Sequence, residues 1–177
     1  MKLFTIFAGI IGFFVLVFVV SLFFPHEYRI ERSTVIKKPV YESFAYLNNI
    51  RNWQEWSPWN REIDSTMESF YSPNVRGLGA TQYFRGNLVG NGRFKIIQSI
   101  TNERICYDLS INQGLIHSSA VFYFKPIGAN TQLFWLDTGD VGYNPVFRFM
   151  LPDKISSTEE GFEEGLRSIK HAAESKL

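Results

Sequence analysis

The hydrophobic and polar positions of the chain change their spacing along its length, and the changes separate different kinds of structure. Residues 3–24 contain no charged side chain. Over residues 26–36, apolar or small side chains alternate with polar ones, which predicts a β-strand. Over residues 67–138, alternating stretches are separated by turns rich in Gly, Asn and Pro about every 8–13 residues, which is typical of an antiparallel meander. We expect these further strands near residues 67–71, 79–86, 92–100, 103–111, 116–125 and 131–139.

Two segments instead have helical spacing. Pro39 is suited to the first turn of a helix, and Val40, Phe44 and Leu47 follow on one face. Residues 50–59 are short and contain a proline, so we expect a helical turn that leads into a loop. Residues 145–152 are apolar and lie between two prolines, which we interpret as a connector. A long terminal helix is expected from Ser156, with one apolar face. That face holds Phe162, Gly165, Leu166, Ile169 and Ala173.

The uncharged run at residues 3–24 predicts a membrane anchor. As a helix it would be roughly 33 Å long, enough to cross a bilayer core. It ends in bulky residues rather than in the small residues of a signal-peptide cleavage site, which favours an uncleaved segment. We therefore expect a transmembrane helix in residues 1–25 of a single-pass protein of the bacterial cytoplasmic membrane. The flanking positive charges leave the orientation open, although a short N-terminal stub favours a domain outside the cytoplasm.

Composition excludes several function classes for the remaining domain, residues 26–177. The chain has 18 Lys+Arg and 17 Asp+Glu, and Lys2 precedes the uncharged run, so the domain carries no net charge. A neutral domain argues against a nucleic-acid partner bound through its phosphates. Cys106 is the one cysteine, so an internal disulfide is impossible. The three histidines are far apart in sequence, and we expect neither a metal site nor a cofactor.

Five short segments, in order, resemble a known superfamily. The sequence is similar to the START-like, or SRPBCC, superfamily, and in particular to its polyketide cyclase/dehydrase-type branch. The similarity is carried by residues 35–44 (strand, Pro, helix), 53–59 (Trp-rich), 77–80 (Gly-x-Gly-Ala), 131–135 (last strand) and 162–170 (closing helix). It implies an α+β helix-grip fold, in which a curved seven-stranded antiparallel sheet wraps around a long C-terminal helix. The expected architecture is therefore this helix-grip fold, preceded by one transmembrane helix. Because this fold hosts carriers, receptors, enzymes and co-chaperones, it does not define the function.

The resemblance also implies a cavity between the sheet and the terminal helix. Strand alternation and the helical face select the side chains that would line it, and Pro58 and Trp59 are expected at its rim. The predicted ligand-binding residues are Trp59, Ile105, Tyr107, Leu109, Phe122, Phe124, Leu133, Trp135, Phe162, Leu166 and Ile169. The alternative is that these side chains only fill a core. In the same way, Trp53, Trp56 and Trp59 either rim a ligand mouth or pin the short helices to the sheet.

Asp137 and Tyr107 are the candidates for proton transfer. If Leu133 and Trp135 point inward, then Asp137 does too, and burial would raise the pKa of its carboxyl group. The alternative is a solvated residue at the end of a strand. His117, with Ser118 beside it, lacks the strained G-x-S-x-G turn of a hydrolase nucleophile.

These features support three functional hypotheses. The first is a membrane-tethered module that binds an apolar or amphipathic small molecule, or a lipid, with residues 3–24 in the membrane. The second is a cyclase- or dehydratase-type enzyme in which Asp137 or Tyr107 moves protons. The third is a protein-interaction module in an envelope or stress response. The sequence names neither the ligand nor a protein partner.

Overall fold

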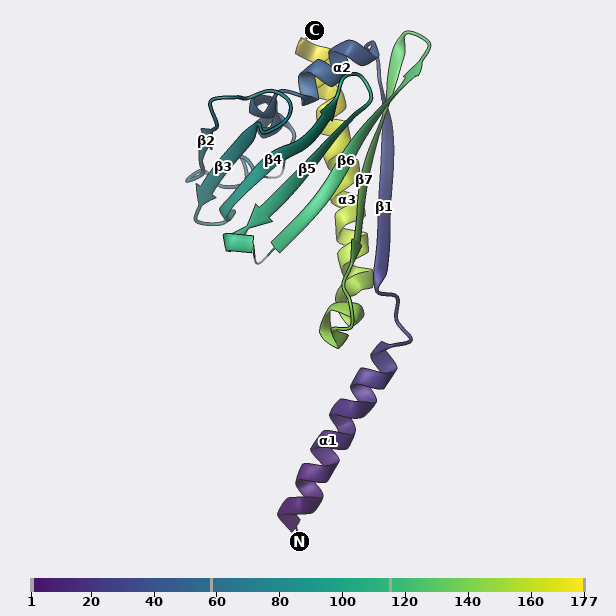
Figure 1. Ribbon diagram of the computed structural model, residues 1–177. Helices are drawn as coiled ribbons and strands as arrows, with labels where there is room; N and C mark the ends of the chain where they lie inside the picture. The colour runs from purple at the N-terminus through teal and green to yellow at the C-terminus, as the bar shows by residue number, and fades with distance from the viewer. Residues whose placement is uncertain (1, 58, 115, 177) are drawn as a thin grey trace.

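The computed structural model describes residues 2–57, 59–114 and 116–176 (Figure 1). A helix at the N-terminus extends away from a body made of one sheet, short helices and one long helix. The helical elements are α1 (Lys2–Ser21), α2 (Val40–Leu47), η1 (Ile50–Glu55), η2 (Asn112–Gly114) and α3 (Pro145–Lys176). The strands are β1 (Glu27–Ile36), β2 (Glu68–Tyr71), β3 (Thr81–Gly86), β4 (Gly90–Ile100), β5 (Arg104–Ile111), β6 (Ile116–Ile127) and β7 (Asn130–Asp140).

The seven strands form one antiparallel sheet in the order β1-β7-β6-β5-β4-β3-β2. The sequence predicted all seven strands, each to within a few residues of its ends. Consecutive strands pair from β2 to β7, and β1 closes the sheet beside β7. The register places Tyr107 opposite Ala120, Ala120 opposite Asp137, and Asp137 opposite Ile30. These four side chains therefore form one row across the inner face, because facing residues on neighbouring strands point to the same side.

The inner face of the sheet packs on α3, which runs alongside β1 (Figure 1). The apolar face predicted for this helix is buried, and an ion-pair cluster fixes its outer side. Arg32 of β1 contacts Glu159 at 2.8 Å and Glu163 at 3.0 Å. The seven-stranded sheet and the long C-terminal helix together form the helix-grip arrangement that the sequence predicted.

The long helix begins eleven residues earlier than the sequence prediction, at Pro145 instead of Ser156. The side chain of Asn144 accepts a hydrogen bond from the backbone N–H of Val146 at 3.0 Å, which caps the first turn. Pro145 follows in the first helical position, where its missing N–H costs nothing. The segment 145–152 is therefore helical, and Pro152 lies within the helix.

The prediction of a single-pass membrane protein is contradicted. Within residues 2–57, 59–114 and 116–176, no helix is both long enough and apolar enough to cross a membrane. The helix α1 ends at Ser21, and Leu22, Phe23 and Phe24 form turns. It is thus three residues shorter at its C-terminal end than the uncharged run on which the prediction relied.

A buried arginine joins the end of α1 to the start of α3. Arg148 is almost fully buried, and its guanidinium donates to the carbonyl oxygens of Gly142 at 2.7 Å and Ser21 at 3.2 Å. It reaches the carbonyl of Phe24 at 3.5 Å as well. The rings of Phe24 and Phe149 meet edge to face beside this junction. These contacts fix the connection between α1 and the body.

Candidate functional site

A cavity of about 360 Å³ lies between η1, the inner face of the sheet and α3. Ligand pockets of proteins begin at about 300 Å³, so this volume suits a small organic molecule. Its lining comes from six parts of the chain: the segment after η1, the strands β4, β5, β6 and β7, and α3. The lining residues are Trp56, Ser57, Trp59, Phe94, Tyr107, Leu109, Ile111, His117, Ser118, Ala120, Trp135, Asp137, Lys154, Ser157, Thr158, Gly161 and Phe162.

Aromatic rings build the inner wall of the cavity. Trp135 of β7 stacks on Phe162 of α3, with ring centroids 4.0 Å apart and planes 10° apart. Its indole N–H donates to the Tyr107 hydroxyl at 3.0 Å, which fixes the ring. Gly165 permits this stack, since a Cβ there would lie 2.6 Å from Trp135 Cζ3. The wall is therefore rigid, because packing and a hydrogen bond both hold Trp135 in place.

Asp137 lies in the polar part of the cavity and is only 4% exposed. The hydroxyl of Ser118 donates to its Oδ2 at 3.1 Å, while Oδ1 is buried and has no hydrogen-bond partner. Burial raises the pKa of the Asp137 carboxyl, and the Ser118 hydrogen bond, the positive charge of Lys154 and the backbone N–H of Thr138 oppose this effect. The carboxyl thus points inward, as strand alternation predicted, and is not a solvated strand-end residue.

Tyr107 is the other candidate for proton transfer. It is buried, and burial together with the charge of Asp137 raises the pKa of its hydroxyl, although the Trp135 hydrogen bond acts in the opposite direction. A phenol with a raised pKa keeps its proton at neutral pH. Its position suits a hydrogen-bonding role more than a role as a base.

The three tryptophans of residues 53–59 have different roles. Trp53 is fully buried and its indole N–H donates to the carbonyl of Leu47 at 2.8 Å, so this ring pins the short helices to the sheet. Trp56 and Trp59 line the cavity instead. The Nε1 of Trp56 is buried without a hydrogen-bond partner. Pro58, which we also considered as a rim position, lies outside the described residues.

The predicted ligand-binding residues fall into two groups. Those that line the cavity are Trp59, Tyr107, Leu109, Trp135 and Phe162. The others are buried in the core beyond its lining: Ile105, Phe122, Phe124, Leu133, Leu166 and Ile169. The first group lines a cavity and the second fills the core, and ligand binding by the first group stays a prediction.

The sequence reasoning missed much of the polar lining and the small residues. On α3, Ser157 and Thr158 lie one turn before Gly161 and Phe162, which also line the cavity. Their small size was the available signal, because small side chains beside a large buried ring leave space for a cavity. His117 lies at the exposed edge of the cavity, and the neighbouring Ser118 hydroxyl is committed to Asp137. The arrangement does not form a Ser-His-Asp triad.

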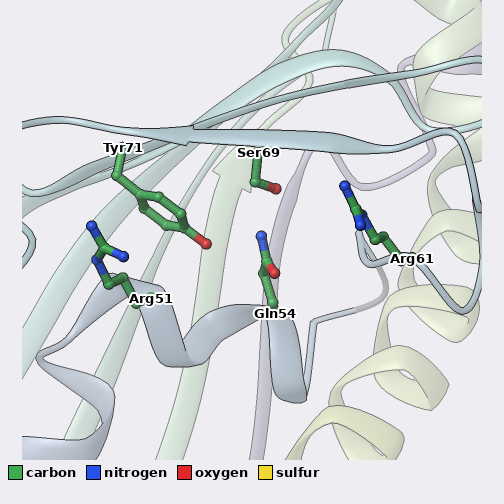
Figure 2. A pocket seen from close by; sticks show the side chains of 5 residues that line it. All are labelled: Arg51, Gln54, Arg61, Ser69 and Tyr71. Carbon is green, nitrogen blue, oxygen red and sulfur yellow. The ribbon is translucent and has the colours of Figure 1, made fainter.

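A second hollow, of about 420 Å³, lies on the outside of η1 and is polar (Figure 2). Arg51 stacks over the ring of Tyr71 at 4.9 Å, and the Tyr71 hydroxyl points toward Gln54. Arg61, on the other side, donates to the carbonyl of Met67 at 2.9 Å. Arg51 is thus engaged by Tyr71 and Arg61 by a backbone carbonyl, and the hollow lacks an apolar wall.

A cluster of possible metal ligands lies at the other end of the sheet. The ligand atoms of His26, Glu27 and Asp140 lie within 4.8 Å of one another. His26 Nδ1 is 3.0 Å from Asp140 Oδ1, so the two side chains already pair. Glu27 and Asp140 are exposed. This is the usual arrangement of a surface ion pair, which needs no metal.

Comparison with known proteins gives the fold. No protein-family model matches the sequence, and no curated protein is similar to it. Among solved structures, the chain is similar to the Aha1 dimer from Colwellia psychrerythraea (18% identity, TM-score 0.58, 83% of this chain and 96% of that one). It is similar to Ara h 8.0201, with 15% identity and a TM-score of 0.60 over 85% of this chain and 99% of that one. It also resembles DynU16, from the dynemicin biosynthetic locus, with 10% identity and a TM-score of 0.58 over 83% of this chain and 47% of that one. At these identities the likeness shows the helix-grip fold alone.

Proposed function

We propose that the protein binds an apolar or amphipathic small molecule in the cavity between the sheet and α3. The observation that carries the proposal is the volume of about 360 Å³ within a wall built largely of aromatic rings. Two of these rings, Trp135 and Phe162, are held in a rigid stack, so the space does not need to be opened by the ligand. A preformed apolar site with a few polar groups is the usual form of a small-molecule site.

The test is uptake of 1-aminoanthracene, whose fluorescence rises in apolar surroundings, by the full-length chain. The variant Gly161→Leu places a large side chain at the cavity, where a Cβ would meet no atom within 4 Å. We expect at least tenfold weaker uptake by this variant. Glu160→Leu is the matched control, because it adds the same side chain at the preceding position, which is exposed and does not line the cavity. Equal uptake by all three proteins would place the dye elsewhere and overturn the proposal.

A cyclase- or dehydratase-type activity is a second candidate, supported by the buried Asp137 carboxyl at the cavity. As a base, this carboxylate would take the α-proton of a bound ketone and leave an enolate. Exchange of the α-protons of 2-tetralone in D₂O, followed by NMR, tests this step without knowledge of the natural substrate. Catalysed exchange that is lost in Asp137→Asn would support this activity. Exchange at the uncatalysed rate in the unmodified protein would exclude it.

A protein-interaction role is the third candidate. Exposed apolar side chains gather at the start of α3 and include Tyr143, Val146, Phe147 and Met150. Scattered apolar side chains on a surface are ordinary, whereas a contiguous patch indicates a contact. Comparing the sedimentation of the full-length chain with that of its Phe147→Ser variant would detect self-association through this surface. Identical sedimentation of the two proteins would count against that role.

A further inference from the structure

Two polar atoms that belong to the lining of the cavity have no partner in the protein. One is the Nε1–H of Trp56, a hydrogen-bond donor, and the other is Oδ1 of Asp137, an acceptor. Both residues are at least nine-tenths buried, at 5% and 4% exposed. Buried polar groups of folded proteins nearly always have a partner, so two unpaired groups at one cavity need an explanation.

The surrounding groups of the same kinds are satisfied, which sets these two apart. The indole N–H of Trp53 donates to a backbone carbonyl, and that of Trp135 donates to Tyr107. The other oxygen of Asp137 accepts from Ser118. Gln82 Oε1 and Arg104 Nε are also buried without a partner but lie outside the lining, so Trp56 Nε1 and Asp137 Oδ1 are the two such atoms, among the described residues, that belong to it.

Trp56 and Asp137 are both neighbours of Trp135. The ring of Trp56 meets the ring of Trp135 edge to face, with centroids 5.3 Å apart. Asp137 follows Trp135 by two residues on β7 and therefore shares its face of the sheet. One molecule lying against the Trp135 ring would therefore lie beside both residues.

Protein encloses both atoms, and a small turn of the Trp56 ring and of the Asp137 carboxyl would expose them to water in the cavity. A ligand that displaces this water must replace its hydrogen bonds or lose affinity. A pure hydrocarbon would leave both groups unpaired, whereas a ligand with matching polar atoms would not. The cavity therefore selects ligands by their polar groups as well as by their apolar surface.

We infer that the ligand of this cavity is an amphipathic molecule that carries a carbonyl or ether oxygen and a separate hydroxyl group. The oxygen accepts a hydrogen bond from Trp56 Nε1, and the hydroxyl donates to Asp137 Oδ1. This inference rests on the proposed function, since it names the class of molecule that the same site takes.

A set of four compounds with one carbon skeleton tests the inference. Fluorene has no polar group, 9-fluorenone adds the acceptor, 2-hydroxyfluorene adds the hydroxyl, and 2-hydroxy-9-fluorenone has both. The dissociation constant of each is measured by equilibrium dialysis against the full-length protein and its variants. The four compounds differ in their free energies of hydration. Each compound is therefore compared with itself between variants, so that this contribution cancels.

The variants remove one group at a time. Trp56→Phe removes the donor and keeps a ring, and we expect it to reduce the affinity advantage of the ketone over fluorene by about tenfold, or about 1.4 kcal/mol. Trp59→Phe is the matched control, because it makes the same change at another lining residue. Asp137→Leu is expected to reduce the advantage of the hydroxyl by a similar factor. Asp137→Asn keeps an accepting oxygen and should keep most of it.

The outcomes separate the inference from the function on which it rests. If all four compounds bind and their relative affinities are the same in every variant, water satisfies the two groups and the inference is overturned while the binding function stands. If none of the compounds binds, the binding function itself fails. A loss of the ketone advantage in Trp56→Phe alone, and of the hydroxyl advantage in Asp137→Leu alone, establishes the assignment.

Discussion

Two buried carboxyl groups in this protein have pKa values shifted in opposite directions. Asp64 is 2% exposed and accepts hydrogen bonds from the Thr66 hydroxyl and from the backbone N–H groups of Leu88 and Val89. These bonds lower its pKa to about 2, the Thr66 hydroxyl having the largest effect. Asp137, with one oxygen unpaired, has a raised pKa because of its burial. Partners available to the charged form, rather than depth alone, decide the direction.

Asp64 is expected to make the fold sensitive to acid. Its folded pKa of about 2 lies below the unfolded value near 3.8, so its stabilising effect is complete above the unfolded value and is lost as the pH falls toward 2. The difference in unfolding free energy between the protein and Asp64→Asn should therefore shrink over this range in urea titrations. Asp153→Asn, at an exposed position of α3, is the control. A difference that does not change with pH would contradict the assignment.

Asp137 should have the opposite effect on the pH dependence of stability. Its folded pKa is raised, so between the ordinary value near 3.8 and the raised value the folded state binds more protons than the unfolded state. Stability should then fall as the pH rises through this window. In Asp137→Asn this part of the decline should be absent, which urea unfolding between pH 3.5 and 7 would measure. Parallel profiles for the two proteins would show that Asp137 ionises normally.

At the scale of elements, two glycines of α3 have opposite surroundings. A Cβ at Gly161 would meet no atom within 4 Å, whereas one at Gly165 would lie 2.6 Å from Trp135. Gly161→Ala should raise the free energy of unfolding by up to about 1 kcal/mol, because alanine favours the helix. Gly165→Ala should lower it by about 1–3 kcal/mol, because it forces the Trp135 ring away. Denaturant midpoints of the two variants check this, and equal shifts would be inconsistent with the Trp135 contact.

Strand alternation made most elements predictable from the sequence. The period of two in β5 and β7 correctly directed Tyr107, Trp135 and Asp137 to the inner face. The start of α3 was missed because residues 145–152 were interpreted as a connector between prolines. The signal was present in Asn144 and Pro145, a capping residue followed by a residue suited to the first helical turn.

The cavity lining was harder to predict than the elements. Trp56 follows the short helix η1, where no period fixes the direction of a side chain. Ser157 and Gly161 contribute to the lining by being small, and a search for large apolar residues passes over them. Leu166 and Ile169 were selected by the same search and lie in the core. A pattern identifies the face of an element but not the depth at which packing stops.

At the scale of the whole molecule, Arg148 is expected to control how firmly α1 is attached. Arg148→Met removes the hydrogen bonds to Ser21 and Gly142, so the segment between α1 and β1 should open more often. Chymotrypsin cleavage after Phe23 should become about tenfold faster while the melting temperature of the body changes little. Arg167→Met, at an exposed position further along α3, is the control. An unchanged cleavage rate would mean that other contacts hold the junction.

The room inside the body is determined where side chains are small. Ala120, in the row between Tyr107 and Asp137, and Gly161, on the facing helix, line opposite walls of the cavity. Neither residue holds two elements together through a large side chain. Single codon changes at these two positions can therefore narrow or reshape the interior while the scaffold stays intact. Descendants of one such protein can diverge in what they accept by small steps, without passing through an unfolded ancestor.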